Sequence, residues 1–316
     1  MDTAVVQAMG DAHKRIEKRK RVFATLSLDN AGQKRVMDGL RRVIFTRGGP
    51  NGSPFCPLDD YELSILENCV GGYVKEGRLI VCGNESVDEA YGVLRHNLLT
   101  GTNDVAPEQF REASNVITQH IFASVPEHFY GVMGSMPVML LMWRAGLAFG
   151  EAALKKHCEQ FFHLGVRRNE HTLETEPYYE DRPYIFRMGA WGAGRVAFAA
   201  DPMLASGNTA MFAIQRLKEY GVREDDIVVL TVISAPEGVD HVLSTFPGVH
   251  IVTGSHDECL DERGYIVPGL GDYGDKYFEG LGRHHTALWW EQGILSDDAR
   301  TALETRMEAI AGMQGA

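Results

Sequence analysis

Short, mostly apolar runs alternate with helical patterns through the middle and later parts of the chain. Such runs cover residues 138–142, 196–200, 227–233 and 249–253, and each has the length of a buried strand. Residues 210–217 follow the second run and have the apolar spacing of a helix. A loop of small residues joins that strand to that helix. This order of strand, loop and helix fits an open α/β sheet.

The first part of the chain looks mostly helical. Asp59 and Asp60 are placed to cap a helix that runs to about residue 68, and residues 46–54 are rich in Gly and Pro, as a loop is. The basic run at residues 14–21 is interpreted as one solvated helix face, with a nucleic-acid or membrane patch as the alternative.

Two further helical stripes lie on either side of the strand-rich region. The stripe near the C-terminus belongs to a helix that begins at Ser296, and it needs an apolar partner in this chain or in another subunit. The other stripe predicts core packing and consists of Phe110, Val116, Ile117, Ile121 and Phe122.

The loop at residues 199–209 carries the most informative chemistry. Its small residues bare several backbone N–H groups at the start of a helix, and that arrangement binds anions. Asp201 stands at the end of the preceding strand, where open α/β sheets bind ligands. A carboxylate beside a phosphate cradle makes sense when the ligand also offers hydroxyl groups or a metal ion. The residues therefore predict a sugar-phosphate site, with an ordinary turn as the alternative.

The same loop resembles the phosphoribosyl pyrophosphate (PRPP) loop of type I phosphoribosyltransferases, above all the uracil phosphoribosyltransferase branch, which reads D-P-M-L-A-T-G-G-S. Asn208 replaces a Gly, and Asn tolerates left-handed backbone angles. The resemblance implies that Asp201 holds ribose hydroxyls and that the amides of residues 205–209 hold the 5′-phosphate. The PRPP-binding residues implied here are Asp201, Pro202, Met203, Leu204, Ala205, Ser206, Gly207, Asn208 and Thr209.

A second motif, at residues 144–146, is similar to the family's L-R-A-G segment, which binds pyrophosphate. An arginine supplies a permanently charged fork, and small residues let the backbone approach the ligand. Arg168 falls on the family arginine that reaches the PRPP phosphates, whereas Asn169 and His171 each remove a negative charge found in the family. The implied pyrophosphate-binding residues of the motif are Arg144, Ala145 and Gly146.

Residues 264–278 give the most specific match, to the family's base-binding segment G-Y-I-V-P-G-L-G-D-x-G-D-R-Y-F. Uracil carries alternating carbonyl and N–H groups, and a Gly/Pro-rich segment can present backbone donors and acceptors to them. Lys276 replaces the family Arg. The implied base-binding residues are Tyr265, Ile266, Gly271, Asp272 and Tyr273.

Shorter stretches continue the match. Residues 92–97 resemble the family's L-L-R-D-K-N, residues 107–111 its K-E-F-R at a helix start, and residues 235–238 its A-P-E-G turn after a strand. Residues 256–258, His-Asp-Glu, are interpreted as solvated polar surface at a strand end rather than as a metal site.

Composition bounds these interpretations. The 316 residues allow one large or two small domains, and a net charge of −12 argues against broad affinity for nucleic acid. The five cysteines show no C-x-x-C spacing, which suggests reduced thiols and no zinc site. No apolar run reaches the length of a membrane span, and the first residues lack the order of a signal peptide. A cytoplasmic protein with no nucleic-acid or membrane partner is expected.

The resemblance implies a type I phosphoribosyltransferase fold: an α/β fold with a central, mostly parallel sheet flanked by helices, a hood, and helical extensions at both ends. The expected division is 1–77, 78–283 and 284–316. The implied reaction moves the phosphoribosyl group of PRPP to a ring nitrogen of uracil, giving UMP and pyrophosphate, with Mg²⁺ and in a homodimer or larger homo-oligomer. The catalytic residues would be Arg144, Asp201 and Asp272.

Two alternatives stay open. The substitutions at Asn169, Tyr273 and Lys276 motivate the same transfer to a different heterocycle, and so does a hood at residues 182–195 that is longer than the family's. Trp191 in that hood could stack on a larger base or pack within the loop. The unexplained flanks motivate a non-catalytic nucleotide sensor, against which the intact pyrophosphate motif argues.

Overall fold

The computed structural model describes residues 58–100, 105–130, 137–156, 158, 160–168, 175–181 and 195–278. The chain divides into two compact units, residues 1–273 and 274–316, and the description of the second unit covers residues 274–278. The predicted loop at 46–54, the basic run, most of the hood with Trp191, and the helix from Ser296 lie outside the described residues.

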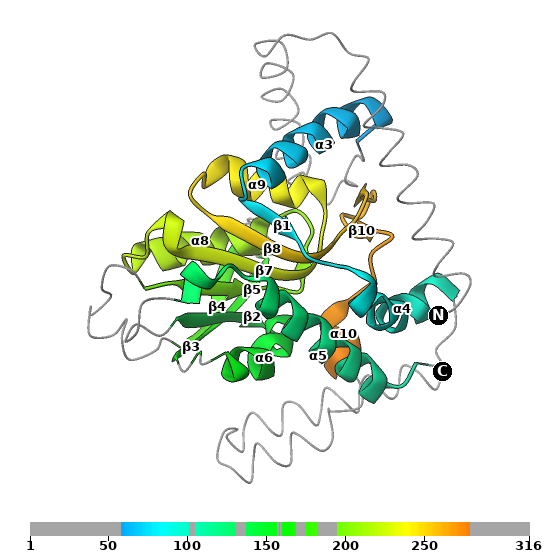
Figure 1. The fold of residues 1–316 in the computed structure, drawn as a ribbon, viewed down its shortest axis with the longest axis horizontal. Coiled ribbons are helices and arrows are strands. Elements are labelled where there is room, and N and C mark those ends of the chain that lie inside the picture. Colours follow the sequence, from blue (N-terminus) through cyan, green and yellow to red (C-terminus); the bar gives the residue numbers. More distant parts are fainter. Residues whose placement is uncertain are drawn as a thin grey trace. The chain divides into compact units, whose positions relative to one another are not determined.

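A mostly parallel sheet forms the centre of the first unit (Figure 1). Its strand order is β1-β8-β7-β5-β2-β3-β4, with β6 also paired to β7. Every pairing is parallel except that of β3 with β4. The predicted α/β architecture is confirmed. The strands are β1 (Leu79–Val81), β2 (Val138–Trp143), β3 (Gln160–Arg168), β4 (Thr175–Asp181), β5 (Ala197–Ala200), β6 (Met203–Leu204), β7 (Ile227–Ser234) and β8 (His250–His256).

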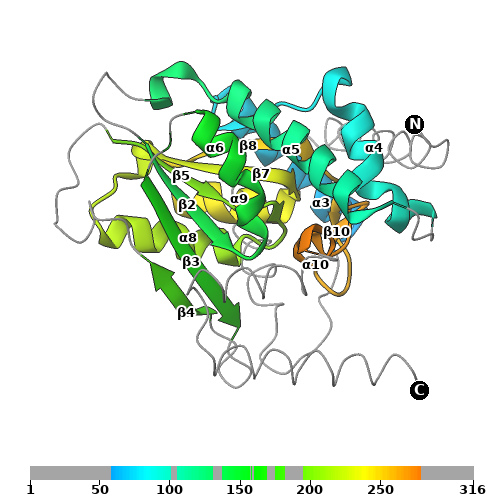
Figure 2. The same ribbon diagram turned by 90° about the horizontal axis from the view of Figure 1, so that it is seen from below.

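Helices cover both faces of this sheet (Figures 1 and 2). One layer holds α3 (Asp60–Lys75), α8 (Asn208–Glu219) and α9 (Pro236–Thr245). The other holds α5 (Pro107–Ser124) and α6 (Gly150–Lys155), with α4 (Glu85–Thr100) packed on α5. The remaining elements are the 3-10 helices η1 (Glu127–Tyr130), η2 (Ala145–Phe149) and η3 (Glu224–Asp226), the hairpin strands β9 (Cys259–Leu260) and β10 (Ile266–Val267), and α10 (Tyr273–Phe278).

The start of α3 is set by a reciprocal cap. Oδ1 of Asp59 accepts the backbone N–H of Glu62 at 2.8 Å, and Oε2 of Glu62 accepts the N–H of Asp59 at 3.0 Å. Two of the unpaired donors at the helix N-terminus are satisfied in this way. The predicted start is confirmed, and the helix continues to Lys75, beyond the predicted end near residue 68.

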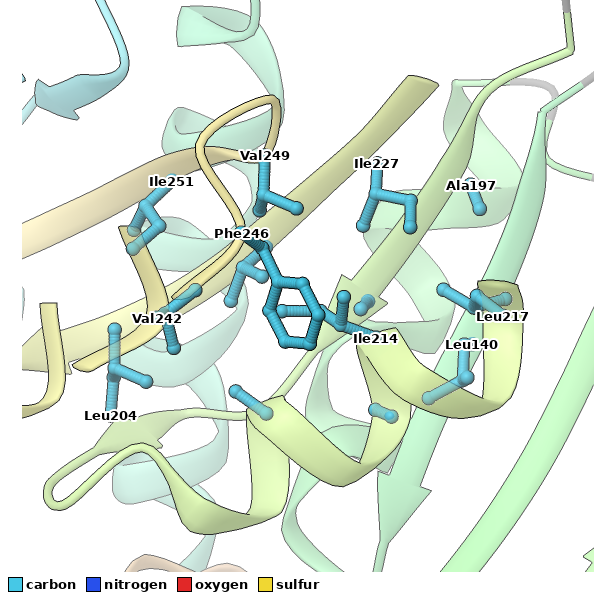
Figure 3. Close-up of a cluster of buried hydrophobic side chains, with 14 of the residues drawn as sticks. Leu140, Ala197, Leu204, Ile214, Leu217, Ile227, Val242, Phe246, Val249 and Ile251 are labelled. Atoms are coloured by element: carbon cyan, nitrogen blue, oxygen red, sulfur yellow. The ribbon is translucent and has the colours of Figure 1, made fainter. Parts of the chain in front are cut away.

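A cluster of buried apolar side chains fills the space between the sheet and the layer of α8 and α9. Figure 3 shows the ring of Phe246 inserted between side chains of α8, α9 and the strands beneath them. Strands β2, β5 and β7 are buried along almost their whole length, as expected for parallel strands with helices on both faces.

The stripe predicted on α5 is confirmed except at one position. Val116 is 49% exposed, because it lies about 100° around the helix from Ile117 and faces away from the sheet. The stripe residues that are buried are Phe110, Ile117, Ile121 and Phe122.

The segment expected to be a turn, residues 235–238, is the start of α9. Ala235 has extended backbone and precedes the helix, and Pro236 takes the first helical position, where its missing N–H costs nothing. The hydroxyl of Tyr73 in α3 donates to Oδ1 of Asp240 in α9 at 2.7 Å, and both side chains are buried. Helix α3 is thereby tied to α9.

Tyr73→Phe should lower the free energy of unfolding by about 1–2 kcal/mol, because it removes a donor from a buried carboxylate. Urea denaturation followed by circular dichroism measures the change. Tyr61→Phe, on the same helix but 44% exposed, is the matched control and should change stability by less than about 0.5 kcal/mol. Equal effects of the two substitutions would contradict the assigned bond.

Candidate functional site

Two of the predicted motifs meet at the ends of adjacent strands. Strands β2 and β5 run parallel, with Leu141 opposite Ala200, so both end at the same edge of the sheet. From β2 the chain continues to β3 on one side, and β5 lies on the other side, so the strand order reverses between β2 and β5. Open α/β sheets bind ligands at such a reversal. Arg144 follows β2 there, and Asp201 follows β5.

The loop after β2 lies close against the end of β5. A Cβ atom added to Gly146 would stand 2.6 Å from the carbonyl oxygen of Ala200, so a larger residue would push the two loops apart. Ala145 begins η2, and the side chain of Arg144 is exposed at the edge of the sheet. The peptide bond between Trp143 and Arg144 is cis.

The predicted phosphate loop turns sharply into α8. Gly207 adopts a left-handed backbone conformation (φ +83°) just before the helix. Asn208 is the first residue of α8, so its replacement of a family Gly requires no left-handed backbone. Ser206 and Asn208 are exposed, whereas Pro202 and Leu204 are buried. The loop thus keeps its apolar residues inside and its polar residues toward solvent.

Asp201 lies at the base of this loop. Its Oδ1 accepts the backbone N–H of Met203 at a long 3.4 Å. Burial raises the pKa of Asp201 to about 6, although the bond from Met203 opposes the shift. The carboxyl group is therefore charged at neutral pH at a cost to the folded state, a pattern found at functional sites.

Helix α9 supports the loop from behind. A Cβ atom on Gly238 would lie 2.3 Å from the carbonyl oxygen of Ala205, and Nδ1 of His241 lies 2.8 Å from the carbonyl oxygen of Ser206. Only the Gly of A-P-E-G signals this contact in the sequence, and nothing there marks His241.

The segment predicted to bind the base, residues 264–278 and called the base-type segment below, begins in the hairpin of β9 and β10. Oδ1 of Asp261 accepts the backbone N–H groups of Arg263 and Tyr265, both at 2.9 Å, and shapes the hairpin loop. Tyr265 is 51% exposed, and Ile266 pairs with Leu260 across the hairpin.

The segment then turns through glycines toward α10. Gly271 has a positive φ of +79°, and Asp272 is exposed beside it. The ring of Tyr273 is buried and meets Phe110 edge-on, with ring centroids 5.3 Å apart. Among the predicted base-binding residues, Tyr273 therefore places its ring in the core, while Asp272 stays at the surface.

A buried ion pair holds this segment. Arg95 of α4 binds Asp257 through two bonds of 2.8 Å, and Asp257 also accepts the N–H of Gly269 at 2.9 Å. Oγ of Ser255 lies 3.0 Å from Arg95 and 2.9 Å from Asp257. Burial by itself raises the pKa of Asp257, but the charge and bonds of Arg95, together with the bonds from Ser255 and Gly269, outweigh it, so the pKa lies below its ordinary value.

The prediction of solvated polar surface at residues 256–258 is wrong. Asp257 is 4% exposed and Glu258 is 2% exposed, because the chain folds back over the end of β8. Arg95 was not predicted as a site residue, and its place in the segment similar to L-L-R-D-K-N was the available signal.

The other predicted residues are placed less fully. Arg168 is the last residue of β3, the strand next to β2, and its side chain lies outside the part of the chain that the structure describes. Within the described ranges, no group of three or more His, Cys, Asp or Glu side chains could hold a metal ion. No helix in the described part of the chain is both long and apolar enough to span a membrane.

Comparison with known proteins identifies relatives of part of this chain. The family model described as uracil phosphoribosyltransferase matches residues 132–280. A uracil phosphoribosyltransferase of Nicotiana tabacum is 40% identical over 136 residues, which cover 43% of this chain and 58% of the relative. A uracil phosphoribosyltransferase of Brucella melitensis is 42% identical over 116 residues, 37% of this chain and 52% of the relative.

The chain spans about half the length of the curated relatives it matches. Among solved structures, the AQ2163 protein of Aquifex aeolicus shares the fold with a TM-score of 0.50 and 24% identity, over 64% of this chain and 98% of that protein. The region that the family model matches, residues 132–280, contains the loops after β2 and β5 and the whole base-type segment. Residues 132–280 of this chain are thus similar to the uracil phosphoribosyltransferase family.

Proposed function

We propose that this protein transfers the phosphoribosyl group of PRPP to a ring nitrogen of uracil, giving UMP and pyrophosphate. The observation that carries the proposal is the meeting of the Arg144 loop and the Asp201 loop across the reversal between β2 and β5. A phosphate loop alone would suit many ligands. An arginine beside it, together with a segment similar to the family's base-binding segment, suits a substrate with two phosphate groups and a base.

The main predicted site residues take roles in this reaction. The amides of residues 206–209, at the N-terminus of α8, hold the 5′-phosphate, whereas the N–H of Ala205, predicted to do so, donates to the carbonyl oxygen of Met203 at 3.1 Å. Asp201 accepts bonds from the ribose hydroxyls, and Arg144 stabilises the charge that develops on the departing pyrophosphate. The ribose carbon becomes oxocarbenium-like as the bond to pyrophosphate breaks. Residues 265–273 present the base, with Asp272 beside it.

Asp201 also fits a role in holding Mg²⁺. Mg²⁺ prefers oxygen ligands and is often held by one or two carboxylates together with substrate phosphates. A carboxyl with a pKa of about 6 is charged at neutral pH and offers such an oxygen. When bound, the ion supplies positive charge to the pyrophosphate oxygens.

We further propose PRPP and a nucleobase as the partners, a homodimer or larger homo-oligomer, a cytoplasmic location, and residues 78–283 as the catalytic core. The net charge of −12 supports small-molecule rather than nucleic-acid partners. Light scattering after gel filtration measures the oligomeric state directly.

Incubation with PRPP, Mg²⁺ and uracil should release pyrophosphate and form UMP, as followed by mass spectrometry. Arg144→Ala should lower kcat/KM for PRPP by about 100-fold, and Arg144→Lys should restore only part of it, because lysine lacks the planar fork. Faster turnover of another base in a panel of heterocycles would replace uracil as the substrate. Tight binding of PRPP without turnover of any base would point to a nucleotide sensor.

Asp201→Asn should make the protein more stable and less active. The folded-state pKa of about 6 lies above the ordinary 3.8, so the stability that Asp201 contributes is complete below pH 3.8 and is lost as the pH rises through 6. At pH 7.5 the substitution should raise the free energy of unfolding by about 1–3 kcal/mol, with little change near pH 4. It should also lower kcat/KM for PRPP by about 10-fold or more. Urea denaturation at both pH values measures the effect, and a loss of stability at pH 7.5 would contradict it.

A further inference from the structure

Two successive carbonyl groups of the phosphate loop face α9. The carbonyl oxygen of Ser206 lies 2.8 Å from Nδ1 of His241, and the carbonyl oxygen of Ala205 lies against the backbone of Gly238, where a Cβ atom would stand only 2.3 Å away. Gly238 thus makes room for one carbonyl, and His241 binds the next.

These contacts fix where the amides of the loop point. In a trans peptide unit the C=O and N–H bonds point in opposite directions. The carbonyl of Ala205 shares its peptide unit with the N–H of Ser206, and the carbonyl of Ser206 shares its unit with the N–H of Gly207. Because both carbonyls face α9, both N–H groups point to the opposite side of the loop. Successive N–H groups on one side of a loop form an anion-binding concavity.

The proton on His241 follows from its partner. A carbonyl oxygen only accepts hydrogen bonds, so Nδ1 carries the proton and donates. Burial lowers the pKa of His241, although the bond to Ser206 and the nearby Asp240 oppose the shift. At neutral pH the ring is therefore uncharged, and the contact acts as a directed hydrogen bond.

The helix that carries His241 is itself anchored. Oδ1 of Asp240 accepts the hydroxyl of Tyr73, and Oε1 of Glu237 accepts the backbone N–H of Leu260 at 3.0 Å. A side chain on a helix held at several points sets geometry more sharply than one on a loop.

We propose that His241 is a positioning residue that aims the amides of Ser206 and Gly207 at the 5′-phosphate of PRPP. The inference rests on the proposed function only in taking PRPP as the ligand of the loop. His241 acts through the loop and touches neither the substrate nor the reacting atoms.

The test compares three variants of the full chain by calorimetric titration with PRPP and Mg²⁺ and by initial rates. His241→Leu removes the donor, whereas His241→Asn places an amide N–H near the position of Nδ1. Thr245→Val is the matched control on the same helix, because its Oγ1 donates to the backbone carbonyl of His241 at 2.8 Å and leaves the imidazole contact intact.

His241→Leu should raise Kd and KM for PRPP by about 3- to 10-fold, the effect of one hydrogen bond, with KM for uracil unchanged. His241→Asn should return both to within about 2-fold of the unsubstituted chain, and Thr245→Val should leave both unchanged. A merely structural role would weaken PRPP and uracil alike and would not be rescued by Asn.

Equal PRPP binding by His241→Leu and by the unsubstituted chain would overturn the inference, as would equal loss with Leu and with Asn. Should the Leu variant melt before assay, the comparison of Asn with the unsubstituted chain still decides, because a loss with Asn contradicts the inference and retention supports it. Binding of PRPP without formation of UMP would refute uracil transfer while the binding comparison still tests His241. UMP formation unaffected by His241→Leu would refute the role of His241 alone.

Discussion

The register of β2 on β5 is the constraint on which the whole candidate site depends. With Leu141 opposite Ala200, β2 runs two residues beyond the end of β5, and the loops that follow the two strands start at the same edge of the sheet. Gly146 allows the first loop to approach the carbonyl of Ala200 closely. A slip of one residue would turn the side chains of β5 to the opposite face and carry Asp201 away from Arg144. Burial of β2 and β5 on both faces makes such a slip costly. The packing of the core therefore also fixes the positions of the two loops.

The described elements before residue 132 complete what the matched region begins. Arg95 of α4 reaches Asp257 and the backbone of Gly269, and Phe110 of α5 packs on Tyr273, so two helices outside the family match hold the base-type segment in place. In the same way Tyr73 of α3 holds α9, and α9 holds the phosphate loop. Both halves of the candidate site are therefore supported by chain that the family match does not include.

Elements with a local signal could be predicted from the sequence, whereas long-range polar contacts could not. The apolar runs predicted β2, β5, β7 and β8, and Asp59 predicted the start of α3, because burial and capping depend on neighbouring residues. The motifs gave the two loops at the sheet edge. Arg95 and Asp257 are 162 positions apart, and nothing near Asp257 distinguishes a buried carboxylate from a solvated one. His241 was missed for the same reason, since its partner Ser206 lies on a different element.

Asp257 and Asp201, two carboxylates near the candidate site, differ in how well the protein compensates their charge. The carboxylate of Asp257 is satisfied by Arg95, Ser255 and the backbone N–H of Gly269, so its negative charge is well compensated by the chain itself, although Nε of Arg95 is buried without a hydrogen bond. Asp201 has one long bond from Met203 and a raised pKa, so its charge is poorly compensated by the protein itself. A group that is stabilised fully by its own chain gains little from a ligand, whereas an under-stabilised carboxylate gains much from hydroxyl donors or a cation. The well-compensated charge of Asp257 therefore lies behind the base-type segment, and the poorly compensated charge of Asp201 lies where the ribose of PRPP is proposed to bind. Because α9 already orients the loop amides, little reorganisation accompanies the reaction.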